Sequence, residues 1–177
     1  MSSEEADSLM KRASELLNLK SHSVTERKTG EKVVMQGPVD LELHLARDGR
    51  YYAVDLARLF PPQKPLPGVK GCFLYKLFRP EFLKNYPKSI SSDCYSYWGR
   101  EDPDNNKEAD EATAYLLDIL IPQLLQSGDL NNSSIEDMKS ILHKWGVNMR
   151  FCSVLYFQSD NPILMKNFAI QVNCVNI

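Results

Sequence analysis

Hydrophobic positions recur at three- and four-residue steps near the start of the chain. They are Ala6, Leu9, Met10, Ala13, Leu16 and Leu17. This spacing places apolar side chains on one face of an α-helix. Ser2 and Glu5 have the spacing of a capping box at its start. We therefore predict a helix over residues 3–18, followed by a polar loop from Lys20 to Lys32.

The next segment alternates between apolar and polar residues, as a β-strand with one buried face does. Val39, Leu41, Leu43 and Leu45 alternate with Asp40, Glu42 and His44. Asp48-Gly49 then precedes the apolar run 51–54, which is typical of a hairpin with a two-residue type I′ turn. We predict a hairpin core over residues 38–60. That turn buries Leu43, Leu45, Tyr52 and Val54 on one face and places Glu42 opposite Asp55 on the other.

The middle of the chain shows weaker periodicity and then two helical stripes. Prolines indicate a stiff loop after Phe60, and Arg79-Pro80 suggests a short helix. Ser, Asp, Asn and Gly predict a loop over 87–106. A helical part is expected over 107–146, with a kink at Pro122, an N-cap at Ser134 and a C-terminal cap at Gly146.

The C-terminal residues return to alternation. The run 151–157 is apolar, and a second pattern alternates apolar with polar residues at Phe168, Ile170, Val172 and Cys174. We predict C-terminal strands within residues 150–177. The fold class is then α+β, with an antiparallel β-hairpin or small sheet packed against several α-helices, and residues 1–177 form a single domain.

Composition narrows the classes of function. The formal net charge of the 177 residues is -2, which argues against binding through phosphates alone, and we expect no DNA partner. The longest apolar runs are far shorter than the ~20 residues of a membrane-spanning helix. The start is acidic and lacks the pattern of a secretory signal. The four cysteines form no C-x-x-C pair. We expect a cytoplasmic protein with reduced thiols, no resident metal and no cofactor.

The hairpin carries a recognisable motif. In order, it contains Asp48-Gly49-Arg50-Tyr51-Tyr52, Val54-Asp55, Arg58 and Phe60-Pro61-Pro62. Gly37-Pro38-Val39-Asp40 precedes it, and the segments 77–82 and 142–150 add two further matches. These stretches resemble the CLU domain of the clustered-mitochondria protein family, over about residues 37–151.

The resemblance implies a function in binding rather than in catalysis. Clustered-mitochondria proteins are large, cytosolic and multi-domain, and act in mitochondrial distribution and in binding messenger RNAs for mitochondrial proteins. For this chain the resemblance implies a non-catalytic, CLU-like module with protein partners and with messenger RNA as a second class of partner. No Cys–His or Ser–His pair has the spacing of a nucleophilic site, so we expect no catalytic residue.

The polar face of the hairpin is the candidate binding site. Like charges placed opposite each other, as predicted for Glu42 and Asp55, destabilise a hairpin unless a neighbour offsets them. His44 lies one step along, and a metal, a water molecule, Arg58 or Arg150 is a candidate to offset the acids. The alternative is a solvated face whose acids pair with nearby bases. Arg150 also suits a carboxylate or a phosphate, or a buried pair with Asp40 or Asp55.

A second hypothesis gives the two acids a more specific role. Glu42 and Asp55 flank a hairpin much as two metal-binding residues do in protein kinases. The other kinase signatures are missing, including the glycine-rich loop. The alternative function is therefore a metal- or nucleotide-binding domain derived from a kinase-like fold.

Overall fold

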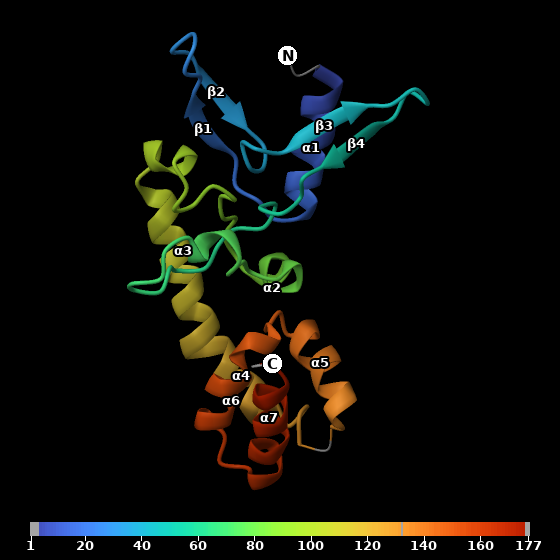
Figure 1. Ribbon diagram of the computed structural model, residues 1–177, viewed down its shortest axis with the longest axis vertical. Helices are drawn as coiled ribbons and strands as arrows, with labels where there is room; N and C mark the ends of the chain where they lie inside the picture. The colour runs from blue at the N-terminus through green and yellow to red at the C-terminus, as the bar shows by residue number, and fades with distance from the viewer. Residues whose placement is uncertain (1–3, 132, 176–177) are drawn as a thin grey trace. The chain divides into compact units, whose positions relative to one another are not determined.

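The fold is described from a computed structural model that covers residues 4–131 and 133–175. The chain divides into two compact units, one ending at Ala112 and one beginning at Thr113 (Figure 1). The class is α+β, as predicted: two antiparallel sheets of two strands accompany helices that make up most of the regular structure. The single domain over 1–177 stays a prediction.

The first helix, α1, spans Glu4–Leu16 and confirms the predicted helix, whereas Ser2 of the capping box lies outside the described residues. The chain leaves the helix at Asn18, which has a left-handed backbone with φ 56°. Its side-chain amide donates to the carbonyl oxygens of Leu83 at 2.7 Å and Tyr86 at 2.9 Å. Asn18 therefore ties the end of α1 to the helix α2 (Pro80–Asn85).

The predicted loop from Lys20 to Lys32 is wrong, because it contains most of a hairpin. Strand β1 (His22–Thr25) pairs antiparallel with β2 (Lys32–Met35), and Val24 lies opposite Val33. His22 and Val24 are buried while Ser23 is exposed, so the strand alternation is present but only four residues long. Charged turn residues on either side concealed it.

The second hairpin exists where predicted, with β3 (Glu42–Leu45) and β4 (Tyr51–Val54), but its register is wrong by one residue. Ala46 and Arg50 close a three-residue loop, since the Ala46 amide donates to the Arg50 carbonyl at 2.9 Å. Gly49 has φ 77°, whereas Asp48 is not among the residues with positive φ. A turn followed by one left-handed glycine is the usual three-residue connection.

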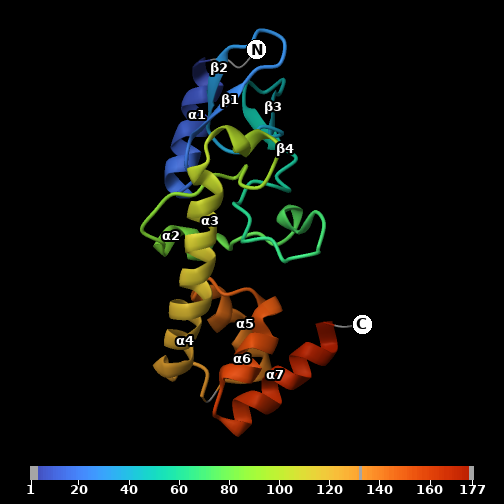
Figure 2. The same ribbon diagram turned by 90° about the vertical axis from the view of Figure 1, so that its left-hand side faces the viewer.

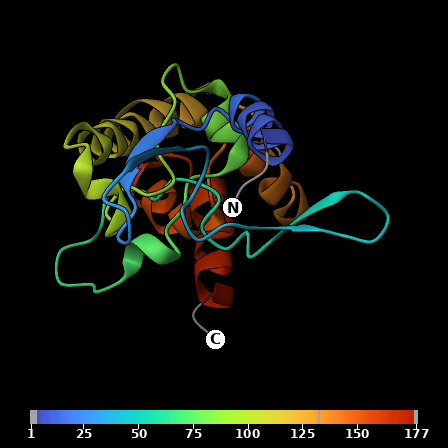
Figure 3. The same cartoon turned by 90° about the horizontal axis from the view of Figure 1, so that it is seen from above.

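A shift of one residue in the register gives every side chain a different neighbour on the opposite strand. Glu42 now faces Val54, and His44 faces Tyr52. The predicted buried face is not buried either: Leu45 is 61% exposed and Tyr52 is 47% exposed. Figure 3 shows this hairpin, in cyan, projecting away from α1.

Three stacked aromatic rings contribute to the core of the first unit. Phe78, Phe82 and Tyr86 stack in sequence, with ring centroids 4.7 and 5.2 Å apart. Helix α2 begins at Pro80 as predicted. The segment 87–103 is mostly irregular, with a 3₁₀ turn η2 over Trp98–Glu101, and another 3₁₀ turn, η1, spans Cys72–Leu74.

Pro122 shapes the long helical stretch that follows. Helix α3 spans Asp104–Tyr115, a π-helical turn η3 covers Leu116–Leu120, and α4 runs Ile121–Ser127. The Ile121 amide donates to the carbonyl of Leu116, five residues back. A proline inside a helix removes one donor and crowds the preceding turn. A π turn thus lies directly before Pro122, in a helical stretch that runs on from α3 into α4 (Figure 2), and the kink stays a prediction.

The predicted C-terminal strands are wrong, because the described residues 152–175 form helices instead. After α5 (Ile135–Lys144) come the 3₁₀ turn η4 (Met149–Phe151), α6 (Cys152–Gln158) and α7 (Pro162–Val175). The buried residues Cys152 and Leu155, and likewise Leu164 and Phe168, are three or four residues apart, which is helical spacing. Asn161 caps α7 by accepting from the Ile163 amide at 3.0 Å. The side chains of Val172 and Cys174 lie outside those described.

The predicted caps of α5 are confirmed. The Ser134 hydroxyl accepts from the amide of Asp137 at 3.1 Å. At the other end Gly146 has φ 73°, and the Val147 amide donates to the Leu142 carbonyl at 2.8 Å. This is the hydrogen-bond pattern of a Schellman cap, which requires a left-handed residue that glycine supplies at low cost.

Candidate functional site

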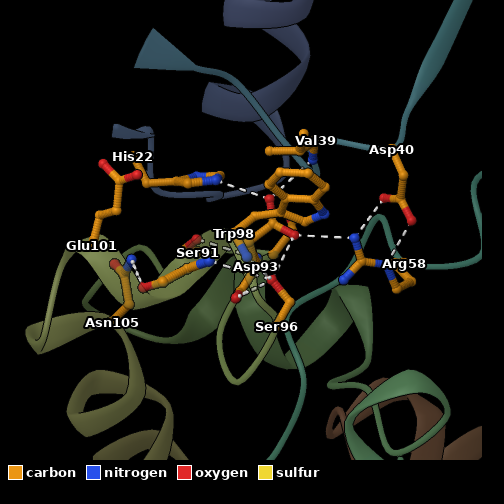
Figure 4. Close-up of polar contacts among 12 residues, drawn as sticks. His22, Val39, Asp40, Arg58, Ser91, Asp93, Ser96, Trp98, Glu101 and Asn105 are labelled. Carbon is orange, nitrogen blue, oxygen red and sulfur yellow. Dashed lines mark hydrogen bonds and ion pairs between the residues drawn. The ribbon is translucent and has the colours of Figure 1, made fainter. Parts of the chain in front are cut away.

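A buried carboxylate, Asp93, organises the first unit. It lies on the irregular segment after α2 and is 0% exposed. One oxygen, Oδ2, accepts from the backbone amide of Val39 at 2.9 Å and lies 2.9 Å from Nε2 of His22. The other, Oδ1, accepts from Arg58 at 3.1 Å and from the Ser96 hydroxyl at 3.2 Å. Four segments distant in sequence therefore meet at one side chain (Figure 4).

Arg58 connects this buried centre to the surface. Its guanidinium donates from Nε and Nη2 to both oxygens of Asp40, each at 2.7 Å, in a bidentate pair. Hydrogen bonds from Arg58 hold the pKa of the Asp40 carboxyl below its ordinary value, and the same bonds raise the pKa of Arg58. Arg58 is therefore a fixed cation between two acids.

His22 comes from β1 and was not predicted as a site residue. Its ring is buried, and Nε2 pairs with Asp93 (Figure 4). In the sequence His22 lies in a polar stretch, and no motif there indicates a functional residue. The one available signal was its alternation with Val24 on a short strand.

Backbone packing closes this centre from the other side. Gly99 lies so near the segment that a Cβ placed on it would stand 2.0 Å from the carbonyl oxygen of Asp93. Both oxygens of the Asp93 side chain already have partners. The arrangement positions β1, the 38–40 segment and Arg58 relative to one another, and its carboxylate has its hydrogen-bonding capacity occupied from within the chain.

The predicted site residues do not form one site. Glu42 and His44 pair with each other along β3, with Oε2 and Nε2 3.0 Å apart, and both are exposed. Asp55 is exposed and follows β4 with φ 56°. Arg58 belongs to the Asp93 centre, and Arg150 lies in the second unit, where its amide donates to Asn148.

The kinase-like hypothesis loses its structural basis here. It required Glu42 opposite Asp55, and the register places Val54 there instead. Among residues 4–131 and 133–175 no group of three or more His, Cys, Asp or Glu side chains is arranged to hold a metal ion. The acids of this hairpin are therefore separate surface groups.

Within the hairpin motif 48–52, Asp48 shapes the turn and Tyr51 lines a cleft. Asp48 accepts from the Arg50 amide at 3.0 Å and from the Tyr52 hydroxyl at 2.9 Å. The Arg50 amide, and next the Tyr52 hydroxyl, lower the pKa of the Asp48 carboxyl. Tyr51 lies directly opposite Leu45, and both side chains line the cleft.

This cleft, the α1–β2–β3 cleft, has a volume of about 800 Å³. Its apolar lining comes from all three elements and includes Met10, Val33, Val34, Leu41, Leu43, Leu45 and Tyr51. Val34 is 62% exposed, as open to solvent as Leu45. Asp7 and Lys11 of α1 are its charged lining residues. The cleft thus presents an open apolar surface with balanced charge.

Three cysteines with described side chains are buried. Cys72, Cys94 and Cys152 are free and buried. Burial raises the pKa of Cys94 to about 12 and that of Cys152 to about 11. At neutral pH the thiols of Cys94 and Cys152 are therefore protonated and poor nucleophiles.

Comparison with known proteins finds one family model that matches part of the chain. The family model described as Clustered mitochondria (CLU) matches residues 1–65, which include α1, both hairpins and Arg58. The match confirms the CLU resemblance over that stretch, whereas the motifs at 77–82 and 142–150 lie beyond it and stay predictions. Neither a curated protein nor a solved structure matches the chain. No helix within the described residues is long and apolar enough to cross a membrane.

Proposed function

We propose that this chain, related to the clustered-mitochondria proteins over its first 65 residues, is a non-catalytic binding module that holds an apolar segment of a protein partner in the α1–β2–β3 cleft. The family relationship suggests that the module works in the cytoplasm, in an assembly linked to mitochondrial distribution and to messenger RNA. The protein contact is the part of this function that the cleft supports.

One observation carries the proposal: apolar side chains line an open cleft inside the segment that matches the family. Val34 of β2 and Leu45 of β3 line the cleft, and each is more than half exposed. Contiguous exposed apolar surface is typical of an interaction site. An isolated two-stranded hairpin is also marginally stable in water, so a partner that covers Leu43 and Leu45 would stabilise β3–β4.

Charge favours a protein segment over RNA as the occupant of the cleft. Asp7 and Lys11 offset each other in the lining. Nucleic-acid binding depends on a local excess of positive charge that neutralises phosphates. A largely apolar peptide segment matches this cleft better, because it gains from burial and loses little to unpaired charge.

The buried acid–histidine pair supports a non-catalytic module. The side chains of His22 and Asp93 are each 0% exposed. A general base must come within hydrogen-bond reach of the proton that it removes from a substrate. Because this pair is enclosed, its role in the proposed module is to hold β1 and the segment around Val39 in place.

Site-specific photo-crosslinking tests the protein contact. A photoreactive phenylalanine analogue replaces Leu45 in the cleft wall or, as a control, Leu66, which is 47% exposed and outside the cleft lining. We expect position 45 to yield a defined crosslinked protein and position 66 to yield none. Equal crosslinking from both positions would contradict the proposal.

The RNA contribution needs a separate measurement. The purified chain is titrated with a messenger RNA for a mitochondrial protein and with a scrambled RNA of the same composition, at physiological salt. Preferential binding of the natural sequence would support an RNA contact by this chain. Equal or undetectable binding would leave the protein partner as its function.

A further inference from the structure

Two arginines meet over one exposed aromatic ring, that of Tyr97. Arg27 lies in the β1–β2 turn, and Arg100 lies in η2. The central carbon of the Arg100 guanidinium is 3.4 Å from the centroid of the Tyr97 ring, and that of Arg27 is 4.7 Å from the same centroid. The two guanidinium groups are therefore no more than about 8 Å apart.

Each guanidinium is held in place by more than one contact. Arg27 also lies 5.2 Å from the ring of Trp98, which meets Tyr97 edge-on. Arg100 donates from Nε to the Tyr97 carbonyl at 3.0 Å. Stacking on rings fixes an arginine while leaving its outward N–H groups available. The pair is thus ordered before any ligand arrives.

The nearby carboxylates of Glu26 and Glu101 are held by threonines and form no ion pair with these two arginines. Glu101 uses both oxygens to accept from Thr25, at 3.0 and 2.8 Å, and Glu26 accepts from Thr29 at 2.8 Å. Neither arginine forms an ion pair with any residue in the described part of the chain. Two like charges at this separation repel, and an anion between them relieves that repulsion.

We propose that Arg27 and Arg100 bind a phosphate monoester on a side chain of a protein partner, a phosphoserine or phosphothreonine. Such a group carries about two negative charges near neutral pH and three acceptor oxygens. Two arginines match it in charge and offer N–H groups in the planar geometry that phosphate oxygens accept. A hollow of about 380 Å³ between the turn and η2 is lined by both arginines, Tyr97 and Trp98.

The surroundings favour one localised dianion over an RNA strand. Glu26 and Glu101 line the same hollow. An RNA backbone carries one charge at each of many phosphates and needs a continuous basic track, which these acids interrupt. This site is separate from the apolar cleft, so its assignment does not rest on the proposed function.

Trp98 provides a reporter at the site. The chain has two tryptophans, and Trp145→Phe leaves Trp98 as the sole one. We would titrate this variant with N-acetyl-O-phosphoserine amide at constant ionic strength and follow its fluorescence. N-acetylserine amide, sodium sulfate and oligouridylate serve as comparison ligands.

We expect a saturable change with the phosphoserine compound and none with the serine compound, and weaker binding of sulfate. In the same background Arg27→Gln or Arg100→Gln should weaken binding by about tenfold, because each removes charge-assisted hydrogen bonds. Arg12→Gln, which removes an exposed charge from α1, should leave binding unchanged.

Three results would overturn the proposal. The first is that the phosphoserine compound gives no saturable change in fluorescence. The second is that Arg27→Gln and Arg100→Gln leave the response to it intact. The third is that oligouridylate binds more tightly than the phosphoserine compound and that both substitutions abolish this binding. The last result would assign the two arginines to RNA. The comparison of the phosphoserine compound with the serine compound uses protein that keeps both arginines. It therefore tests whether the phosphate group is bound even if an arginine variant misfolds.

Discussion

Gly99 shows how tightly the backbone packs around Asp93. A side chain at this position has no space, since its Cβ would stand 2.0 Å from the Asp93 carbonyl oxygen and 2.7 Å from the carbonyl carbon. Backbone atoms cannot swing aside as the end of a flexible side chain does. The position therefore requires glycine for reasons of close approach.

We expect Gly99→Ala to lower the free energy of unfolding by about 3 kcal/mol, the upper range for overpacking. Gly68→Ala is the matched control. Gly68 has φ 78° and nothing near the position of a Cβ atom. Alanine there should lower the free energy of unfolding only through the strain of a left-handed backbone, by about 1 kcal/mol. Urea denaturation of both variants makes the comparison, and equal losses would contradict the close packing.

Asp93 and Asp40 share Arg58, but only Asp93 is enclosed. Asp93→Asn removes the buried charge that faces Arg58, so we expect a loss of about 3 kcal/mol or more. Asp40→Asn should cost about 1 kcal/mol, because solvent screens a half-exposed pair. Urea denaturation at pH 7 measures both. A larger loss for Asp40→Asn would show that the buried centre is misassigned.

The lowered pKa of Asp40 predicts a specific response to acid. A carboxyl whose pKa is lower in the folded state stabilises the fold above its unfolded pKa of about 4, and this contribution is lost as pH falls through the folded pKa. Asp40→Asn should therefore narrow the difference in unfolding free energy between pH 6 and pH 2.5. An unchanged difference would mean that Arg58 does not hold this carboxylate in solution.

At the scale of elements, the β3–β4 turn shows what the sequence can and cannot specify. Asp48-Gly49 correctly marks a hairpin, but the same dipeptide fits a two-residue and a three-residue loop. The side chain of Asp48 favours the longer loop by accepting from the Arg50 amide and the Tyr52 hydroxyl. The register therefore follows from hydrogen bonds that the alternation of hydrophobic residues does not encode.

Gly49→Val should open this hairpin, because a β-branched residue resists φ 77°. We expect a cost of ~1 kcal/mol or more, seen as faster amide hydrogen exchange across residues 42–54. In Asp48→Asn the amide hydrogens of the hairpin should exchange almost as slowly as in the wild type, since asparagine keeps a side-chain oxygen that accepts from the Arg50 amide. Unchanged exchange in Gly49→Val would contradict the three-residue loop.

The other errors of prediction concern short elements. Four-residue strands such as β1 carry too few positions to separate alternation from chance. At the C-terminus, Phe168 and Ile170 fit a period of two, but the Asn161 cap and the buried Leu164 and Phe168 fix a helix. Capping signals proved more informative than alternation, as they did for Ser134 and Gly146.

At the scale of the whole molecule, the resemblance to the clustered-mitochondria family over residues 1–65 could be recognised from the sequence, and the centre of the fold could not. The hairpin motif lies within the matched residues 1–65. Arg58 was among the predicted residues, but its partner Asp93 lies 35 residues further along, and His22 lies 71 residues before Asp93. No local pattern marks contacts over such separations, because only the folded chain brings these groups together.

The binding cleft is the central claim, and affinity for the protein crosslinked from position 45 tests it most directly. That protein is purified and titrated against wild type, Leu45→Glu and Leu66→Glu by isothermal titration calorimetry. We predict that Leu45→Glu weakens binding by about tenfold or more, because a charge would be buried in an apolar contact, while Leu66→Glu binds as the wild type does. Equal affinity for all three proteins would contradict the cleft as the binding surface.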